Sequence, residues 1–395
     1  MTVDELNWLD GRLRRLQGPD RPWTILFRAQ LTDPISRAAV EDAWRAVVTA
    51  RPELHVSPAI DGWRAWRTTD ADPVVHVGDL GPELERARHG RDDRAISVVV
   101  DHDPATTISL VVDHALTDGL GGRAILEDLL RALVGAEVNP RPRVDDDALD
   151  TLRTRRLGLR AAIGQIPPRR VATLGATGPT TRLASRTVDL APIDDMRRAG
   201  RSTHGGSTPV SVGTVIAGAT LDVLRAQSHA SGSGRGTVAI GVPVDLRRHV
   251  GAPTGTGNAI VNLTIRDRVG GSDSTAADLG AISAAITERT THRRLAETLS
   301  WMKRATRPGP PSTTTRTGRH VATAMVSNLG HLGSDPCWAL VDRVEFAPPA
   351  HQTISIGITG LHGRLAITVR SRLQDPSVTY ELAGALAARL GSGTL

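Results

Sequence analysis

The 395-residue chain is poor in cysteine, lysine and aromatic residues, and each shortage narrows what the protein can be. Cys337 is the single cysteine, which excludes an intrachain disulfide and a cysteine-ligated zinc site and fits a reducing, cytoplasmic location. Phe, Trp and Tyr make up 3% of the residues, so aliphatic side chains and alanine must fill the cores. Lys303 is the only lysine, and arginine therefore supplies nearly all of the positive charge.

Long hydrophobic runs and several familiar catalytic motifs are also missing. No stretch of 18 or more apolar residues occurs, and residues 1–16 lack the apolar centre of a signal peptide, so we expect neither a membrane span nor secretion. The histidines are dispersed, without a His-Glu-x-x-His motif, and we expect no metal. A Gly-x-Ser-x-Gly elbow is absent as well, and nothing around Cys337 indicates a nucleophile.

The charge balance is basic, with a formal net charge of +6 and a pI of about 10.7. Such a balance favours partners that carry phosphate or acidic groups, namely nucleic acid, a cofactor such as coenzyme A, or an acidic carrier protein. The arginines are interspersed with acidic residues, and no basic segment alternates with aromatic side chains. This pattern is typical of a solvated surface, so we expect no nucleic-acid partner.

Residues 106–133 predict a strand, a sharp turn and a helix. An apolar, β-branched run occupies residues 108–113, and apolar residues recur at helical spacing over residues 119–133. The turn between them reads His-Ala-Leu-Thr-Asp-Gly and contains His114, Asp118 and Gly119. Asp118 has two open roles, since it can cap the helix or reach a cation, while glycine relaxes the backbone where strand and helix pack closely.

Two interpretations of His114 are open on the hexapeptide alone. A histidine at the mouth of a strand can project its ring into a cleft, and imidazole, which titrates near neutral pH, suits a general base that takes a proton from a hydroxyl or amine. The alternative is a strand-end histidine whose ring is satisfied by the backbone. The spacing His-x-x-x-Asp-Gly does not separate the two.

The remaining patterns predict a mixed α/β fold in two lobes. They include a helix capped by Ser36, a hairpin of residues 96–100 with 106–113, and a single helix over residues 276–305. Helical and strand-like segments alternate without a regular β-α-β repeat, which argues against a doubly wound nucleotide-binding fold. From about residue 139 to 182 the composition shifts to proline, aspartate and arginine, as in a surface crossover. We therefore predict an N-terminal lobe over residues 1–165, with the crossover beginning near 139, and a C-terminal lobe over residues 166–395.

The order of several short segments resembles one superfamily, that of peptide condensation domains, polyketide-associated acyltransferases, wax ester synthases and plant acyltransferases with the chloramphenicol acetyltransferase fold. The resemblance covers nearly the whole chain. The segments that carry it are the helix at residues 6–16, Arg-Pro-Glu-Leu-His at 51–55, the signature at 114–119, Pro-Val-Asp-Leu-Arg at 243–247, Gly-Asn at 257–258 and Ser-Asn-Leu-Gly at 327–330.

The resemblance implies two chloramphenicol acetyltransferase-like lobes in a V shape, with a tunnel between them and His114 midway along it. Asp118 would turn away from the substrate and pair with an arginine, for which Arg247 is the candidate by motif position. Asn258, Ser327 and Asn328 would line or latch the tunnel. No tightly bound cofactor is implied, and the donor substrate would be an acyl-coenzyme A or the phosphopantetheine thioester of an acyl or peptidyl carrier protein.

One position departs from the superfamily pattern. Many relatives have two adjacent histidines at the signature, and here the first of them is Asp113. Because His114 matches the catalytic position, this departure does not exclude activity. Asp113 either changes the basicity of His114 or points away along the strand, and the sequence leaves both open.

These observations favour an acyltransferase of lipid or natural-product biosynthesis. In this hypothesis His114 acts as general base while a hydroxyl or amine of a small acceptor attacks the thioester, giving an ester or an amide without an acyl-enzyme. The alternative is a repurposed member that binds a carrier-tethered intermediate or catalyses a non-transfer reaction such as cyclisation, since fold does not fix chemistry.

Overall fold

The computed structural model describes most of the chain. The described residues are 7–16, 23–58, 66–68, 72–78, 80, 95–103, 105–152, 171–202, 209–230, 236–269, 278–305, 322–333, 335–350 and 353–393. The α-helices are α1 (Trp8–Leu16), α2 (Arg37–Ala50), α4 (Gly119–Leu133), α5 (Asp146–Thr151), α7 (Leu190–Ser202), α8 (Val212–Ala230), α9 (Leu279–Arg289), α10 (His292–Ala305) and α11 (Ser377–Gly391). None of these described helices is long and apolar enough to cross a bilayer.

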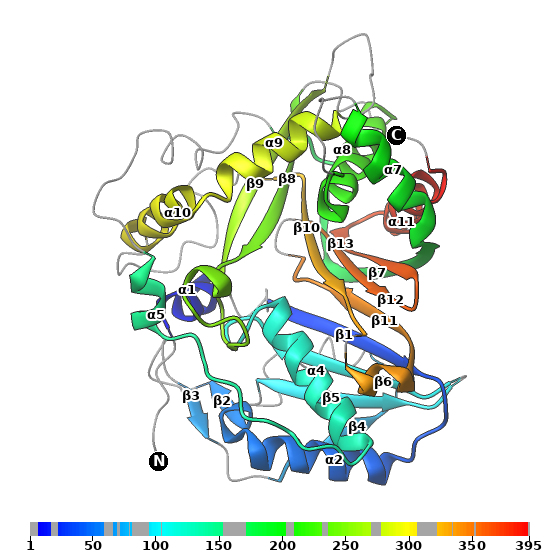
Figure 1. Ribbon diagram of the computed structural model, residues 1–395. Helices are drawn as coiled ribbons and strands as arrows, with labels where there is room; N and C mark the ends of the chain where they lie inside the picture. The colour runs from blue at the N-terminus through cyan, green and yellow to red at the C-terminus, as the bar shows by residue number, and fades with distance from the viewer. Residues whose placement is uncertain are drawn as a thin grey trace.

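The strands form two larger sheets and a two-stranded pair (Figure 1). The first sheet has the order β11-β1-β6-β5-β4, the second β7-β13-β12-β10-β8-β9, and β2 pairs with β3. Their bounds are β1 (Thr24–Leu31), β2 (Val56–Pro58), β3 (Trp66–Thr68), β4 (Val75–Val77), β5 (Ile96–Asp101), β6 (Thr107–Asp113), β7 (Thr177–Asp189), β8 (Gly236–Asp245), β9 (Ile260–Val269), β10 (Ala324–His331), β11 (Val341–Ala347), β12 (Ile354–Leu361) and β13 (Arg364–Leu373). The predicted mixed α/β class is confirmed.

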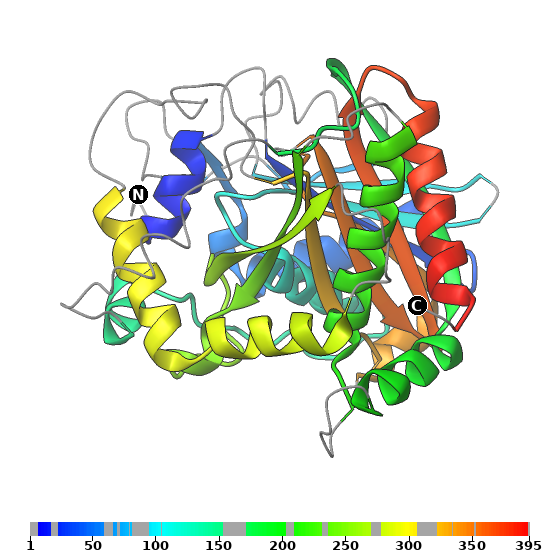
Figure 2. The same ribbon diagram turned by 90° about the horizontal axis from the view of Figure 1, so that it is seen from above.

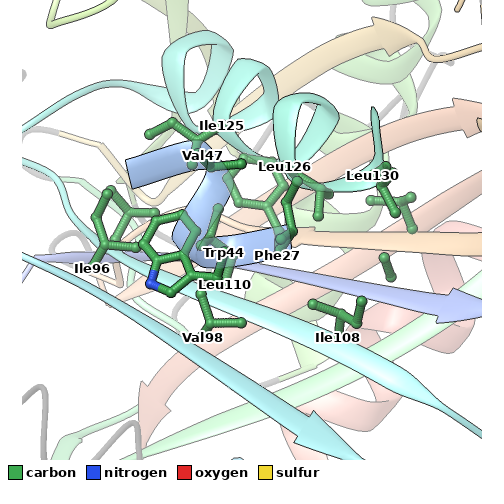
Figure 3. Close-up of a cluster of buried hydrophobic side chains, with 14 of the residues drawn as sticks. Phe27, Trp44, Val47, Ile96, Val98, Ile108, Leu110, Ile125, Leu126 and Leu130 are labelled. Atoms are coloured by element: carbon green, nitrogen blue, oxygen red, sulfur yellow. The ribbon is translucent and has the colours of Figure 1, made fainter. Parts of the chain in front are cut away.

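Helices α2 and α4 pack on one face of the first sheet (Figures 1 and 3). Alternate residues of the strands face these helices because strand side chains have a period of two. The strand side chains meet the apolar stripes of the helices in one core, whose labelled members are Phe27, Trp44, Val47, Ile96, Val98, Ile108, Leu110, Ile125, Leu126 and Leu130. This core holds the end of β6 and the start of α4 in fixed positions.

Local sequence signals explain the elements around the turn. The predicted hairpin is present, since β5 and β6 pair antiparallel from Ile96–Val112 to Asp101–Thr107. Ser36 caps α2 as predicted, its hydroxyl accepting a hydrogen bond from the Ala39 N–H at 3.2 Å. The single helix predicted over residues 276–305 is wrong, because α9 ends at Arg289 and α10 begins at His292.

The second sheet carries its helices on the face away from the first sheet. Helices α7, α8 and α11 lie together along it in both views (Figures 1 and 2) and share one core with its strands. Leu365, Ile367 and Val369 of β13 belong to that core. The intervening residues of β13 therefore face the opposite way, toward the first sheet.

Strand β11 joins the two sheets, although it comes late in the chain. It pairs antiparallel with β1 as the edge of the first sheet and also packs on β12 of the second. At Gly357 of β12 an added Cβ would lie 1.8 Å from the Phe346 carbonyl oxygen, so only glycine admits this backbone approach. The predicted lobe boundary at 165/166 lies outside the described residues, and the first sheet takes this strand from the C-terminal half.

We expect Gly357→Ala to destabilise the protein by about 1–3 kcal/mol or more, because the methyl group collides with backbone that cannot rotate away. The matched control is Gly384→Ala in α11, where an added Cβ meets nothing within 4 Å. That change should raise the free energy of unfolding by up to about 1 kcal/mol through helix propensity. Urea unfolding of both variants measures the difference, and equal stability of the two would contradict the proposed backbone contact.

Candidate active site

The turn after β6 is fixed by backbone hydrogen bonds on both sides. The His114 N–H donates to the Trp23 carbonyl at 2.7 Å, and the Leu116 N–H donates to the Asp113 carbonyl at 2.9 Å. A carboxylate oxygen of Asp113 accepts the Ala115 N–H at 2.7 Å. The acidic residue that replaces the first histidine of the superfamily pattern thus folds over its own turn and braces it.

The His114 ring lies at the end of this turn and is 8% exposed. Its Nδ1 is 3.1 Å from the Thr117 carbonyl oxygen. Because a carbonyl oxygen only accepts, the neutral ring carries its proton on Nδ1 and donates it there. The lone pair is left on Nε2, for which no hydrogen bond is found among the described residues. The Trp23 ring lies alongside, with 6.4 Å between the ring centroids.

Asp118 begins helix α4 and is completely buried. One carboxylate oxygen accepts the Gly121 N–H at 3.0 Å and the Arg247 Nη2 at 2.8 Å, and the other accepts the Ala259 N–H at 3.0 Å. Burial alone would raise the pKa of Asp118, but the charge and hydrogen bond of Arg247, with the two backbone donors, outweigh it and hold the pKa below its ordinary value. Asp118 is therefore an ionised structural group that both caps the helix and meets a cation.

All three guanidinium nitrogens of Arg247 donate hydrogen bonds to groups of the protein itself. Nε donates to the Gly255 carbonyl at 2.7 Å, Nη1 to Asp245 at 2.9 Å, and Nη2 to the Gly257 carbonyl at 2.8 Å besides Asp118. Burial opposes its charge, yet the two carboxylates raise the pKa of Arg247 above its ordinary value. The structure therefore brings together Asp118 and the arginine that the superfamily pattern selects.

Asn258 supports the same turn from behind. Its Nδ2 donates to the His114 carbonyl at 2.8 Å and to Asp10 at 2.7 Å, and it is completely buried. The Asn258 N–H also donates to Asp10, at 3.0 Å. Asn258, which was predicted to line or latch the tunnel, holds the backbone of the residue that carries the imidazole.

Two residues of this support were not identified from the sequence, Asp10 of α1 and Arg143. Arg143 Nη2 donates to Asp10 at 2.7 Å and to the Leu116 carbonyl at 2.9 Å, so the acid on α1 holds the turn through two partners. Burial raises the pKa of Asp10, despite the opposing charge of Arg143. The available signal was Asn7 and Asp10, two polar residues three apart at the start of the helix predicted over residues 6–16.

Gly119, Ser327 and Asn328 lie where α4 meets β10. A Cβ on Gly119 would come within 2.9 Å of the Leu329 side chain, so glycine lets the helix start against β10. Ser327 is half-buried, and Asn328 is exposed with its side-chain oxygen accepting the Gly330 N–H at 2.8 Å. No hydrogen bond among the described residues joins Ser327 or Asn328 to His114.

The side chains that could serve as a thiol nucleophile or as metal ligands do not form a second reactive site among the described residues. Cys337 is buried, and burial together with nearby Asp335 raises the pKa of its thiol, which therefore stays protonated at neutral pH. Over the part of the chain that the structure describes, no three His, Cys, Asp or Glu side chains are grouped as metal ligands would be. The imidazole of His114 is thus the basic group that the turn presents.

No protein-family model and no curated protein matches the chain in sequence. Its fold is that of several solved structures. TRI101 of F. graminearum complexed with coenzyme A and deoxynivalenol is 14% identical, with a TM-score of 0.71 and coverage of 94% of this chain and 95% of that one. TRI3 trichothecene 15-O-acetyltransferase from Fusarium sporotrichioides is 12% identical, with a TM-score of 0.69 over 98% and 94%.

The epimerization domain from the third module of tyrocidine synthetase B is 14% identical, with a TM-score of 0.64 over 100% of this chain and 96% of that one. The structural neighbours are thus acetyltransferases and condensation-related domains with the chloramphenicol acetyltransferase-like fold, which confirms the resemblance at the level of the fold. At these identities the likeness establishes architecture and leaves the reaction to be argued from the site.

We expect Asp118→Asn to cost about 3–5 kcal/mol at neutral pH, because it removes the fully buried partner charge of Arg247 and leaves only the more exposed Asp245. The pKa of Asp118 is lower in the folded than in the unfolded protein, so its contribution is present above the unfolded value and lost as the pH falls through the folded value. The free energy of unfolding should therefore fall more steeply below about pH 4 in the wild type than in the variant.

The control for this measurement is Asp42→Asn, which removes an exposed ion pair with Arg45 and should change stability little. Urea titrations at several pH values give the slopes. If the wild type and Asp118→Asn lose stability in parallel on acidification, the Asp118 carboxylate does not carry the pH dependence.

Proposed function

We propose that the protein is an acyltransferase that moves an acyl group from a thioester donor to the hydroxyl or amine of a small acceptor, with His114 as general base. The observation that carries this proposal is the contact of Nδ1 with the Thr117 carbonyl, which leaves the lone pair on Nε2. The ring is anchored by one nitrogen, and its backbone is held by Trp23 and Asn258. A positioned imidazole of this kind suits proton transfer at neutral pH.

The reaction then proceeds in one ternary complex. Nε2 of His114 takes the proton of the acceptor O–H or N–H as that atom bonds to the thioester carbonyl carbon. The tetrahedral oxyanion collapses, the C–S bond breaks, and the thiolate leaves with the electron pair. The proton passes from the imidazolium to the thiolate, so that a free thiol and an ester or amide are released and His114 is regenerated.

In this mechanism Asp118 and Arg247 are positioning residues. Both are buried and ionised, and each is already bonded to backbone groups and to the other. Neither side chain takes up or releases a proton at neutral pH. Their role is to fix the start of α4 against the segment at residues 255–259 and so hold the turn that presents the imidazole.

The donor that we favour is an acyl-coenzyme A, and the acceptor a hydroxyl. Support comes from two neighbours in fold, TRI101 complexed with coenzyme A and the 15-O-acetyltransferase TRI3. A donor tethered to a carrier protein by phosphopantetheine carries the same thioester and remains compatible with this chemistry. The second candidate is a repurposed site without transfer, which the fold shared with an epimerization domain favours.

We expect His114→Ala to lower kcat for transfer on the order of 10²–10⁴-fold, the contribution of a general base, without loss of fold. Thiol release from acyl-coenzyme A donors of increasing chain length, with and without alcohols and amines, measures it. The matched control is His102→Ala, which removes an exposed histidine from the β5–β6 turn and should leave the rate unchanged.

Full activity in His114→Ala would rule out this mechanism. If the wild type releases no thiol from any coenzyme A donor, the same assay is repeated with an acylated carrier protein. Release from the carrier alone assigns a tethered donor, and binding of the carrier without release favours the repurposed site.

A further inference from the structure

Three arginines are buried among the described residues, and one of them differs from the others in its partners. Arg51 donates to Asp128 at 2.6 Å, and Arg247 donates to Asp118 at 2.8 Å. Arg370 of β13 is 5% exposed, and its contacts are neutral. Nη1 donates to the Thr24 carbonyl at 2.5 Å, and Nη2 donates to the Thr24 hydroxyl at 3.0 Å.

The charge of Arg370 is not compensated within the described part of the chain, where it forms no ion pair with a carboxylate. Burial lowers the pKa of Arg370 to about 10, and the positive charge of Arg372 on the same strand adds to the effect. The group is still cationic at neutral pH. Of its five N–H donors two are used at Thr24, and Nε is buried without a hydrogen-bond partner.

The position of Arg370 connects it to the candidate active site. It lies on the face of β13 opposite the helix core, where it reaches across to β1 of the first sheet. The pairing of β1 with β11 reaches only to Leu26, and the guanidinium bonds the Thr24 carbonyl beyond that end. The preceding residue, Trp23, accepts the His114 N–H. Arg370 and the turn at His114 are thus bonded to two adjacent residues, Thr24 at the start of β1 and Trp23 just before it.

We propose that Arg370 is an anion-recognition residue, which binds a carboxylate or phosphate group of the substrate where the two sheets meet near His114. A planar guanidinium fork matches both groups in a bidentate arrangement. A buried cation with only neutral partners costs stability, and a bound anion would recover that cost. The part of this proposal that concerns selectivity for an anionic substrate rests on the proposed acyl transfer. Anion binding at Arg370 does not depend on that function.

Two sources of the anion fit this chemistry. An acceptor that carries a carboxylate beside its hydroxyl would place the acid on Arg370 and the hydroxyl at His114. Alternatively, a phosphate of the donor would occupy the same fork. The two differ in which substrate loses affinity when the guanidinium is removed, and the experiment is designed on that difference.

The first measurement is independent of activity. Thermal unfolding of the full chain is followed while acetate or inorganic phosphate replaces chloride at constant ionic strength. The wild type should be stabilised by at least one of the two anions, since a ligand bound only by the folded state raises Tm. Arg370→Gln should abolish the response and Arg370→Lys should retain part of it. Arg364→Gln, which removes an exposed arginine of the same strand, should respond as the wild type does.

The second measurement assigns the source of the anion. Transfer rates are compared for a hydroxy acid and its amide as acceptors, and for acyl-coenzyme A and acyl-pantetheine as donors. Arg370→Gln should lower kcat/KM about tenfold to hundredfold for the anionic member of one pair only, as expected for loss of hydrogen bonds to a charged group. The acceptor pair or the donor pair that shows this loss identifies which substrate carries the anion.

Equal Tm responses in the wild type and Arg370→Gln, or no response of the wild type to either anion, would overturn the assignment. If Arg370→Gln fails to fold, the Tm response of Arg370→Lys decides the question: no response overturns it. An anion response lost in Arg370→Gln with no transfer from any donor would leave Arg370 as an anion site and refute the acyltransferase function instead.

Discussion

The buried ion pair between Asp118 and Arg247 is the interaction on which the rest of the candidate site depends. Its two members lie 129 residues apart and next to different sheets, since Asp118 caps α4, which packs on the first sheet, and Arg247 follows β8 of the second. Neither charge can be left alone in the interior without a cost of several kcal/mol. The pair therefore permits one register between α4, the end of β8 and the segment at residues 255–259, and in that register the turn at His114 is formed.

The residues around His114 hydrogen-bond mainly to the backbone of its turn and much less to its ring. The backbone on either side of the imidazole is held by Trp23, Asn258 and, through Leu116, Arg143. Within the part of the chain that the structure describes, the ring itself is hydrogen-bonded at Nδ1 alone. Because almost all of these hydrogen bonds act on the main chain, Nε2 keeps its lone pair while the imidazole still has a defined direction.

The sequence was informative where the determining interactions are local. Apolar alternation and helical spacing predicted the β5–β6 hairpin and α4, and Ser36 marked the start of α2. Asp10 was missed because its partner Asn258 is 248 residues away and nothing in the neighbouring sequence distinguishes it from a surface acid. Strand β11 was missed because Asp342, Arg343 and Glu345 give it a polar pattern. Pairing with β1 and the contact of Glu345 with Arg28 make it a strand.

The close approach of β11 to Gly357 has a mechanical consequence. At that point the Phe346 carbonyl lies against the Gly357 backbone, and Gly357 has no side chain to separate the two strands. If one sheet rotated against the other about this contact, the atoms at the contact would move little. The strands farthest from it would move most. In the second sheet that strand is β9, three positions from β12 and so roughly 14 Å away by ordinary strand spacing. For a given rotation the displacement would grow with that distance, and on this side the Asp118–Arg247 pair beside β8 and the Ala259–Asp118 hydrogen bond beside β9 resist it.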